Sequence, residues 1–474
     1  MLTSDIRVPC LIIRLRKIMK ISMTERIFDA LVTTFLILSV QAIFIQTQMI
    51  HAQNMSSIVR VNNNKIIDNF LLLDHQPQVA VSGNKVYIVW VSHYTGNDDI
   101  YFARSSDGGA TFGNIINLSN DPGDSYNPHL SIVGNNVYVV WVDGTPGPYG
   151  NPDILFRAST NGGASFGPTI NVSNNLGFST EPEMAVSGNN IYIVWRDNTL
   201  GNEGIFFKRS INNGVSFGSP VYLSYSYSKD INSVRPQIVA SANDVYVIWS
   251  SGNFDNGHSD VLFKRSINNG ATFGSTTNIS KNPTTLSTLQ RISVSGSKVY
   301  IVWADGSFNK RQIFFKRSMD GGATFSNTTT ITNATTGDSF NPQIAASSNK
   351  VYLLWQYDLG NISKQLFLKR STDSGSSFSN TTTMNQGQKD SSDALLNSSG
   401  NNVYVIWDDN STGNSKIFFR KSIDAGANFS SIISLSNPGG QSQYPSMVPN
   451  NNNIYAAWQD RIQGNIGIFF KRID

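Results

Sequence analysis

Eight short apolar segments, each ending in tryptophan, recur along the chain. They read VYIVW, VYVVW, IYIVW, VYVIW, VYIVW, VYLLW, VYVIW and IYAAW. Their tryptophans are Trp90, Trp141, Trp195, Trp249, Trp303, Trp355, Trp407 and Trp458. The spacing is about 53 residues, a period typical of proteins built from one repeated supersecondary unit.

Each repeat is predicted to form four short β-strands. In the third repeat the apolar runs are EMAVSG (183–188), IYIVWRD (191–197), GIFFKRS (204–210) and SPVYLS (219–224). The second and third runs are apolar on both faces, so neighbouring sheets must cover both of their faces. Four-stranded antiparallel sheets arranged around an axis cover one another in this way. The pattern therefore predicts an all-β protein, a single β-propeller.

The two ends of the repeat region predict how the ring closes. The last repeat ends at IGIFFKRID (466–474), which supplies a third strand but no fourth. Residues 58–70, IVRVNNNKIIDNF, precede the first repeat at the place of a fourth strand. If they complete the last blade, no sheet edge stays exposed. We therefore expect eight four-stranded blades. A seven-bladed ring and an open solenoid with capping repeats are the alternatives.

A ten-residue motif follows the third strand of seven repeats. It reads RSSDGGATFG at residues 104–113 and returns as ASTNGGASFG, RSINNGVSFG, RSINNGATFG, RSMDGGATFS, RSTDSGSSFS and KSIDAGANFS. An Asp or Asn side chain accepts hydrogen bonds from its own turn, glycine permits left-handed backbone, and the Phe can fill space between sheets. A motif that occurs once per blade, and that tolerates Asn for Asp, indicates a structural role.

The motif resembles the Asp box, or BNR repeat, of the sialidase superfamily. The first copy matches S-x-D-x-G-x-T-F through Ser105, Asp107, Gly109, Thr111 and Phe112. The resemblance implies a β-propeller in which these boxes are fold markers. It also implies an exo-α-sialidase type of glycoside hydrolase as one candidate function.

The catalytic set that the resemblance implies is incomplete in this sequence. Sialidases of this fold use three arginines for the substrate carboxylate, a Tyr nucleophile supported by Glu, an Asp acid and an F-R-I-P motif. The nearest match to that motif here is VRP, residues 234–236, in the fourth repeat. Sialidase propellers have six blades, whereas this sequence predicts eight. These departures favour a propeller without catalytic activity, although the sequence does not decide whether the protein is an enzyme.

The N-terminal segment has the pattern of an export signal. Six basic residues precede an apolar run at residues 30–45, among them Arg14, Arg16, Lys17, Lys20 and Arg26. The run is short for a membrane span. Ala52 is a suitable small residue before a cleavage site. We expect residues 1–52 to be a signal peptide or an uncleaved N-terminal anchor, and residues 53–474 to be the propeller. The expected location is secreted or at the cell surface, with membrane contact only through an uncleaved N-terminus.

Composition narrows the classes of partner. The chain has 474 residues, only 14% of them charged, with a net charge of +4. No basic cluster indicates a nucleic-acid surface. The single cysteine, Cys10, lies in the N-terminal segment, so the propeller must be stable without a disulfide. No ligand spacing for calcium or another metal is present, and no cofactor is expected. The expected partner is a glycan or an extracellular protein.

Function is expected on one face of the ring. The turns between first and second strands and between third and fourth strands are short and uniform. The loops between second and third strands and between fourth and first strands vary, for example residues 92–99, 143–152, 251–259 and 305–312. We call the side that carries these variable loops the loop face. Variable loops on a rigid scaffold are where binding residues usually lie.

Glutamates are scarce in the predicted propeller, and the few present are expected in one sector of the loop face. Residues 53–474 contain only three glutamates, Glu181, Glu183 and Glu203. Arg235 and Arg291 take the positions of Glu181 and Glu183 in the following two repeats. We expect these side chains to gather near the central funnel, either as a solvated salt-bridge cluster or as an anion- or sugar-binding pocket with a carboxylate for acid–base chemistry.

The candidate residues follow from this sector and from the loop aromatics. The candidate catalytic residues are Glu181, Glu183 and Arg235. The candidate ligand-binding residues are Arg196, Asp197, Glu203, Arg291, Tyr94 and Tyr357. Exposed aromatic rings could stack on sugars, with ordinary loop packing as the alternative; the rings considered are Tyr94, Tyr149, Phe254, Phe308 and Tyr357. An Asp two residues after Trp recurs as Asp143, Asp197, Asp305, Asp409 and Asp460, which favours a turn cap.

The sequence thus favours a secreted or surface-attached propeller that binds a glycan or protein partner through its loop face. The alternative is a sialidase-like glycoside hydrolase of the exo-α-sialidase type.

Terminal sequencing of the exported protein tests the leader. Cleavage after Ala52 should give a chain that begins at Gln53. Recovery of the intact N-terminus only in the membrane fraction would instead establish the anchor.

Overall fold

The computed structural model divides the chain into two units, Met1–Met55 and Ser56–Asp474. It describes residues 57–62, 77–144, 151–224, 231–282, 284–332, 337–358, 360, 364–386, 390–462 and 465–474. The expected leader, residues 1–52, lies outside this part of the chain. Within it, no helix is long and apolar enough to cross a membrane.

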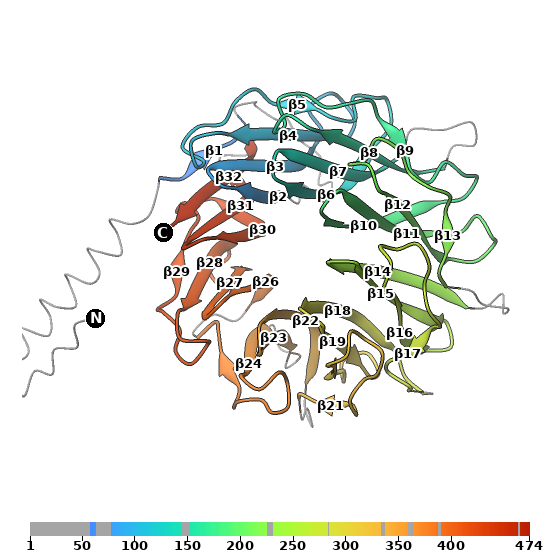
Figure 1. Cartoon of the computed structure of the whole chain (residues 1–474). Coiled ribbons are helices and arrows are strands. Elements are labelled where there is room, and N and C mark those ends of the chain that lie inside the picture. The colour runs from blue at the N-terminus through green and yellow to red at the C-terminus, as the bar shows by residue number, and fades with distance from the viewer. Residues whose placement is uncertain are drawn as a thin grey trace, which may run out of the picture. The chain divides into compact units, whose positions relative to one another are not determined.

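Eight four-stranded antiparallel sheets form a ring in the second unit, so the predicted eight-bladed β-propeller is confirmed (Figure 1). The strands of blade 1 are β2 (Gln78–Ser82), β3 (Lys85–Ser92), β4 (Asp99–Ser105) and β5 (Ile116–Asn117). Those of blade 2 are β6 (Ser125–Val133), β7 (Asn136–Asp143), β8 (Asp153–Ser159) and β9 (Ile170–Asn171). Those of blade 3 are β10 (Ser179–Ser187), β11 (Asn190–Asp197), β12 (Gly204–Ser210) and β13 (Val221–Tyr222). Those of blade 4 are β14 (Asn232–Ser241), β15 (Asp244–Asn253), β16 (His258–Ser266) and β17 (Thr277–Asn278).

The second half of the ring repeats this order. The strands of blade 5 are β18 (Ser287–Ser295), β19 (Lys298–Asp305), β20 (Gln312–Ser318) and β21 (Thr329–Thr330). Those of blade 6 are β22 (Asp338–Ser347), β23 (Lys350–Asp358), β24 (Lys364–Ser371) and β25 (Thr382–Thr383). Those of blade 7 are β26 (Ser391–Ser399), β27 (Asn402–Asp409), β28 (Lys416–Ser422) and β29 (Ile433–Ser434). Blade 8 contains β30 (Gln441–Asn450), β31 (Asn453–Ile462), β32 (Asn465–Ile473) and, from the start of the chain, β1 (Val59–Arg60). The first strand of each blade is the innermost one (Figure 1).

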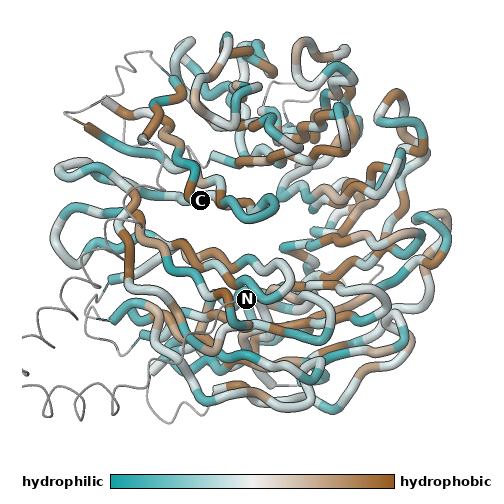
Figure 2. Tube along the Cα trace, turned by 60° about the vertical axis from the view of Figure 1, so that its left-hand side comes forward, coloured by the Kyte–Doolittle hydropathy of each residue, from teal (hydrophilic) through white to brown (hydrophobic). Residues whose placement is uncertain are grey.

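The core lies between neighbouring blades. Tyr87 and Val89 of β3 and Phe102 of β4 pack against Val139 and Trp141 of β7 in the next blade. Apolar stretches follow the strands and many connecting turns are hydrophilic (Figure 2). Each blade therefore covers its neighbour, as the two-sided apolar strands require.

The repeated motif forms a hydrogen-bonded turn. In the first copy Gly109 N donates to Ser105 Oγ at 2.9 Å, and Thr111 N donates to Asp107 Oδ1 at 2.9 Å. In the second copy Ser165 N donates to Asn161 Oδ1 at 3.0 Å. Because the turn needs only an acceptor, Asn serves as well as Asp. The predicted structural role of the motif is confirmed.

The same turn joins each blade to the preceding one. The Phe112 ring lies 5.3 Å from the Phe470 ring, edge to face. Gly109 has a φ of +88°, and a Cβ atom there would lie 2.1 Å from the Phe470 ring. Only glycine combines this backbone conformation with this contact. Each motif is therefore a joint between two sheets.

Arginines of the third strands strengthen these joints. Arg104 Nη1 donates to Gly162 O of the following blade at 3.1 Å. The same bond recurs around the ring, from Arg209 to Asn269, Arg265 to Gly321, Arg317 to Ser374 and Arg370 to Ala425. These arginines therefore have a structural role.

The N-terminal strand closes the ring. β1 pairs antiparallel with β32, with Val59 opposite Phe470. Val61 N donates to Ile468 O, and Ile468 N donates to Asn62 Oδ1, both at 2.8 Å. The Val61 side chain is buried in the core cluster of blades 1 and 8. Closure by the N-terminal segment is confirmed for residues 59–62; residues 63–70 of the predicted segment lie outside the described residues.

The predicted division into two faces is also confirmed. Gly108 N donates to Asn84 O, which places the repeated motif beside the turn between first and second strands. Ser125 N donates to Asp98 O, which places the start of β6 beside the loop between β3 and β4. The first strands therefore begin at the loop face and end at the opposite face.

Truncation through Asn62 tests closure. It removes Val61 from the core and leaves β32 as an unpaired edge, so the free energy of unfolding should fall by about 3–5 kcal/mol, measured by urea denaturation. Truncation through Met55 is the matched control and should leave stability unchanged. Equal stability of the two truncated proteins would show that the strand is dispensable.

Candidate functional site

A β-bulge interrupts the first strand of seven blades. The register shifts at this point in β6, β10, β14, β18, β22, β26 and β30. Within each bulge one residue has a positive φ: Asn127, Glu181, Arg235, Leu289, Asn341, Asp393 and Tyr444. We call these seven the bulge residues. Left-handed backbone is unusual for such side chains, and a bulge re-aims the side chains beside it. The innermost strands thus present a repeated irregularity near the loop face.

Blade 3 gathers the charges that the sequence singled out. Arg196 Nη1 lies 3.6 Å from Glu181 Oε1, and Arg196 Nε lies 3.5 Å from Glu203 Oε2. Arg196 Nε also donates to Thr180 Oγ1 at 3.1 Å. Arg235 N donates to Glu181 Oε2 at 2.7 Å. Arg196 therefore lies between two carboxylates, and the expected gathering is observed for Glu181 and Glu203. Arg235 contacts Glu181 only through its backbone amide, and its Nη1 donates to Thr288 Oγ1 of blade 5 at 2.9 Å.

Burial changes the proton affinity of this cluster. It raises the pKa of Glu203, and repulsion from Glu181 and Asp197 adds to the rise, whereas Arg196 opposes it. The carboxylate of Glu203 is therefore more easily protonated than that of a fully hydrated glutamate.

Glu183 lies between blades 2 and 4. Gln237 Nε2 donates to Glu183 Oε1 at 2.7 Å, and His129 Nδ1 lies 3.6 Å from Glu183 Oε2. Burial lowers the pKa of Arg291. The charge of Glu183 opposes this change and the charge of Arg235 adds to it, which shows that both side chains lie near Arg291. Arg291 Nη1 donates to Gln290 O at 3.1 Å. We call Glu181, Glu183, Glu203 and Arg196 the acidic sector. Arg291 lies between this sector and the next part of the ring.

Asp197 serves as an internal cap. It is 0% exposed and accepts hydrogen bonds from Ser179 Oγ at 2.6 Å, Trp195 Nε1 at 3.1 Å and Thr199 N at 2.8 Å. Burial raises its pKa, but the hydrogen bonds outweigh burial and lower it. The same serine bond occurs at Asp143, Asp305 and Asp409. This supports the turn-cap interpretation; a ligand contact of Asp197 stays a prediction.

The two candidate tyrosines differ in their surroundings. Tyr94, in the loop after β3, is 55% exposed. Tyr357, on β23, is half-buried, and its ring lies 5.5 Å from the Phe367 ring. Tyr149 lies outside the described residues. Ligand binding by Tyr94 and Tyr357 stays a prediction.

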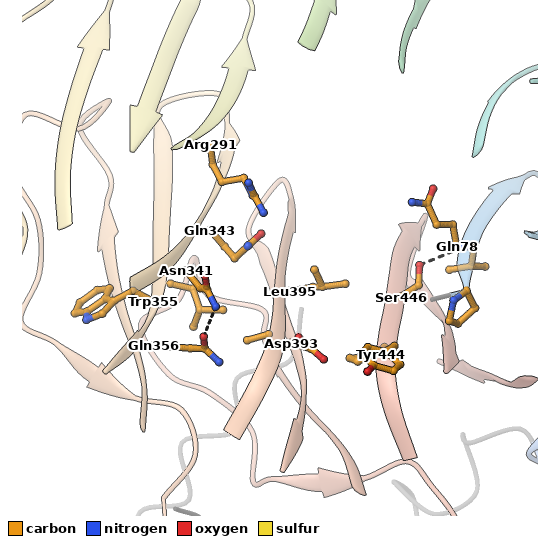
Figure 3. Close-up of a pocket in the computed structure, with 15 residues that line it drawn as sticks. Gln78, Arg291, Asn341, Gln343, Trp355, Gln356, Asp393, Leu395, Tyr444 and Ser446 are labelled. Carbon is orange, nitrogen blue, oxygen red and sulfur yellow. Dashed lines mark hydrogen bonds between the residues drawn. The ribbon is translucent and has the colours of Figure 1, made fainter. Parts of the chain in front are cut away.

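A cavity of about 390 Å³ lies among the first strands of blades 5 to 8 and blade 1. Arg291 and Gln343 lie on one side of it and Gln78 and Ser446 on the other, with Leu395 between them (Figure 3). The bulge residues Asn341, Asp393 and Tyr444 also line it. We call this space the central cavity. Arg291 therefore borders both the acidic sector and the cavity.

Sequence reasoning missed most of the cavity. It recognised that Arg235 and Arg291 occupy the positions of Glu181 and Glu183, but did not extend that equivalence to Asn341, Gln343 and Asp393. A signal was available, because a proline follows the bulge residue in five blades, as Pro128, Pro182, Pro236, Pro342 and Pro445.

Blade 7 contains a buried acid, Asp408, which pairs with Ser392 on the strand that supplies Asp393 to the central cavity. Asp408 is 3% exposed, and the hydroxyls of Ser392 and Ser415 donate to its carboxyl group at 3.1 Å. Burial raises the pKa of Asp408 to about 7, and the charge of Asp393 adds to the rise. Among the described residues, no group of three or more His, Cys, Asp or Glu side chains could hold a metal ion.

No family model matches the chain, and no curated protein matches it. Solved structures resemble it at low identity. An ulvan lyase of polysaccharide lyase family PL25 is 14% identical, with a TM-score of 0.49 over 78% of this chain and 94% of that chain. A mutant Trypanosoma rangeli sialidase with trans-sialidase activity is 12% identical, with a TM-score of 0.38 over 73% of this chain and 53% of that chain. The endosialidase of phage phi92 is 11% identical, with a TM-score of 0.40 over 89% of this chain and 69% of that chain. These three named proteins act on glycans; no activity is transferred to this chain on that basis.

Asp408→Asn tests the buried acid. The carboxyl titrates near 3.8 when unfolded and near 7 when folded, so its stabilisation is complete below pH 3.8 and lost as the pH rises through 7. Between pH 4 and pH 8 the wild type should therefore lose up to about 4 kcal/mol more stability than the variant, since one pKa unit is worth about 1.4 kcal/mol. Urea denaturation at both pH values measures this, and parallel pH profiles of the two proteins would contradict a raised pKa.

Proposed function

We propose that this propeller binds a glycan, with a saccharide ring in the central cavity. The observation that carries the proposal is the lining of the cavity. Five blades contribute polar side chains to one space of about 390 Å³. That volume lies within the range of small-molecule sites, in which a few placed polar groups fix the ligand's orientation.

The lining has the hydrogen-bonding chemistry that sugar hydroxyls require. A hydroxyl both donates and accepts, and so does a carboxamide. Gln78 Oε1 accepts from Leu130 N at 3.0 Å, and Asn341 Nδ2 donates to Gln356 Oε1 at 2.6 Å. Each of these amides has two donor and two acceptor positions, so one internal bond leaves others for a ligand. The Arg291 guanidinium adds several donors of fixed geometry.

The position of the cavity supports entry from the loop face. Asn341, Asp393 and Tyr444 all lie in the first halves of strands that begin at that face. The variable loops lie on the same face, and Tyr94 is exposed on one of them. A glycan partner outside the cell would agree with the proposed export of residues 53–474.

The contacts of the acidic sector favour binding over hydrolysis. Glu181 accepts from the backbone of blade 4, and Glu183 accepts from Gln237 of the same blade. These bonds join blades 3 and 4, a structural use of the two carboxylates. We therefore propose a binding protein, with the sialidase-like glycoside hydrolase as the alternative that the assay must address.

A glycan array probed with residues 53–474 tests the proposal. At least one class of oligosaccharide should bind, and Arg291→Ala should weaken its binding about tenfold in titration calorimetry, because charge-assisted hydrogen bonds are lost. Arg157→Ala is the matched control, since Arg157 lies on β8 and bonds to Thr169 at 2.7 Å, away from the cavity lining.

Two results would contradict this function. Absence of binding across the array would refute glycan recognition. Turnover of aryl sialosides or other aryl glycosides, abolished by Glu183→Gln or Arg235→Ala in folded protein, would establish the hydrolase instead.

A further inference from the structure

One exposed aromatic ring on the loop face is held in place by its neighbours. Phe308 lies in the loop between β19 and β20 of blade 5 and is 76% exposed. Lys310 N donates to Ser307 O at 2.9 Å, and Asn309 has a φ of +68°. This is the pattern of a type II turn, with Phe308 at its first central position. The turn thus presents the ring at its tip.

A guanidinium group supports the ring from beneath. The Arg311 Cζ atom lies over the Phe308 ring, 5.1 Å from its centroid, and over the Phe340 ring, 4.9 Å from its centroid. Both distances are within the range of cation–π attraction. Arg311 Nε donates to Asp338 Oδ1 at 3.0 Å and to Oδ2 at 3.2 Å, and Arg311 Nη2 donates to Oδ2 as well. We call Phe308, Arg311 and Phe340 the aromatic platform.

The platform adjoins the central cavity. Phe340 directly precedes Asn341, which lines the cavity from blade 6. Arg311 N also donates to Asp338 Oδ1 at 2.8 Å, so the blade 5 loop is attached to the start of β22. The platform and the cavity therefore share one strand.

We propose that the aromatic platform is a second saccharide subsite, which stacks a sugar ring next to the one in the central cavity. This rests on the proposed glycan-binding function. It deepens that function, because the bound glycan must then extend over at least two rings. The C–H face of a pyranose is apolar and lies flat on an aromatic ring, where burial and dispersion stabilise it.

The surroundings of the ring favour a sugar over a protein partner. Ser307, Asn309 and Lys310, beside Phe308 in the turn, are exposed and polar. A protein interface core is a contiguous, fully buried apolar patch, which this single ring does not provide. Because the Arg311 contacts already restrict Phe308, stacking a sugar costs little additional side-chain entropy.

Ligands of increasing length distinguish binding at the aromatic platform from binding in the central cavity. The probes are the mono- to hexasaccharides of galacturonic acid, xylose and N-acetylglucosamine, titrated into residues 53–474. Phe308→Ala should weaken binding of the longer members of a bound series about tenfold and leave binding of its monosaccharide unchanged. Phe308→Tyr should retain wild-type affinity, since it keeps the ring.

Phe178→Ala is the matched control. Phe178 is also an exposed ring on the loop face, 49% exposed in blade 3, but it does not line the cavity. Its removal should change no affinity. Thermal unfolding of all three variants should match the wild type.

Three outcomes would overturn the subsite. Unchanged affinity of Phe308→Ala for every length would show that the platform makes no contact. Equal weakening for monosaccharide and oligosaccharides would place Phe308 in the cavity site itself. Binding of none of the three series by the wild type would reject the subsite, whereas glycan binding itself is decided by the array, and the first two outcomes leave glycan binding intact.

Discussion

The second strand of each blade, which carries the repeated tryptophan, is apolar on both faces, and both faces must be kept from water. Residues Val86 to Val91 of β3 are almost completely buried, one face by blade 8 and the other by blade 2. A row of such sheets has two uncovered ends unless it closes. The ring, with β1 added to β32, is the arrangement in which no blade has an exposed apolar face.

Closure of the ring fixes the places where chemistry can occur. The repeated turns use their Asp, Asn, Gly and Phe residues to join neighbouring blades, and the third-strand arginines reinforce those joints. The side chains of these residues make contacts within the scaffold and are therefore not candidates for ligand binding. The first strands, in contrast, carry bulges at which side chains of different chemistry are directed toward one another from separate blades. A uniform scaffold thus surrounds a variable centre.

How much the sequence predicts differs between these two parts. The Trp period and the last repeat, which lacks a fourth strand, were enough to predict eight blades and closure by the segment 58–70, because strand patterning and edge satisfaction are local rules. The structure shows this closure for residues 59–62. The proximity of Glu181, Arg196 and Glu203 was also anticipated, because the scarce glutamates all fall in the third repeat. Asn341, Gln343 and Asp393 were not recognised, because amide and acid residues are common in the loops and strands of this chain and carry no local signature.

The sequence by itself determined the fold, the order of the blades and the structural role of the repeated turn, since each depends on patterns within about fifty residues. Only the tertiary structure decided what meets at the axis. Arg291 and Gln78 are far apart in the chain, yet both line the central cavity because the ring brings the first strands of blades 5 and 1 to the same space. The Phe308, Arg311 and Phe340 platform likewise exists only because one blade's loop packs on the next blade's first strand. Such sites depend on which side chains of separate blades meet, and no pattern within one repeat encodes that.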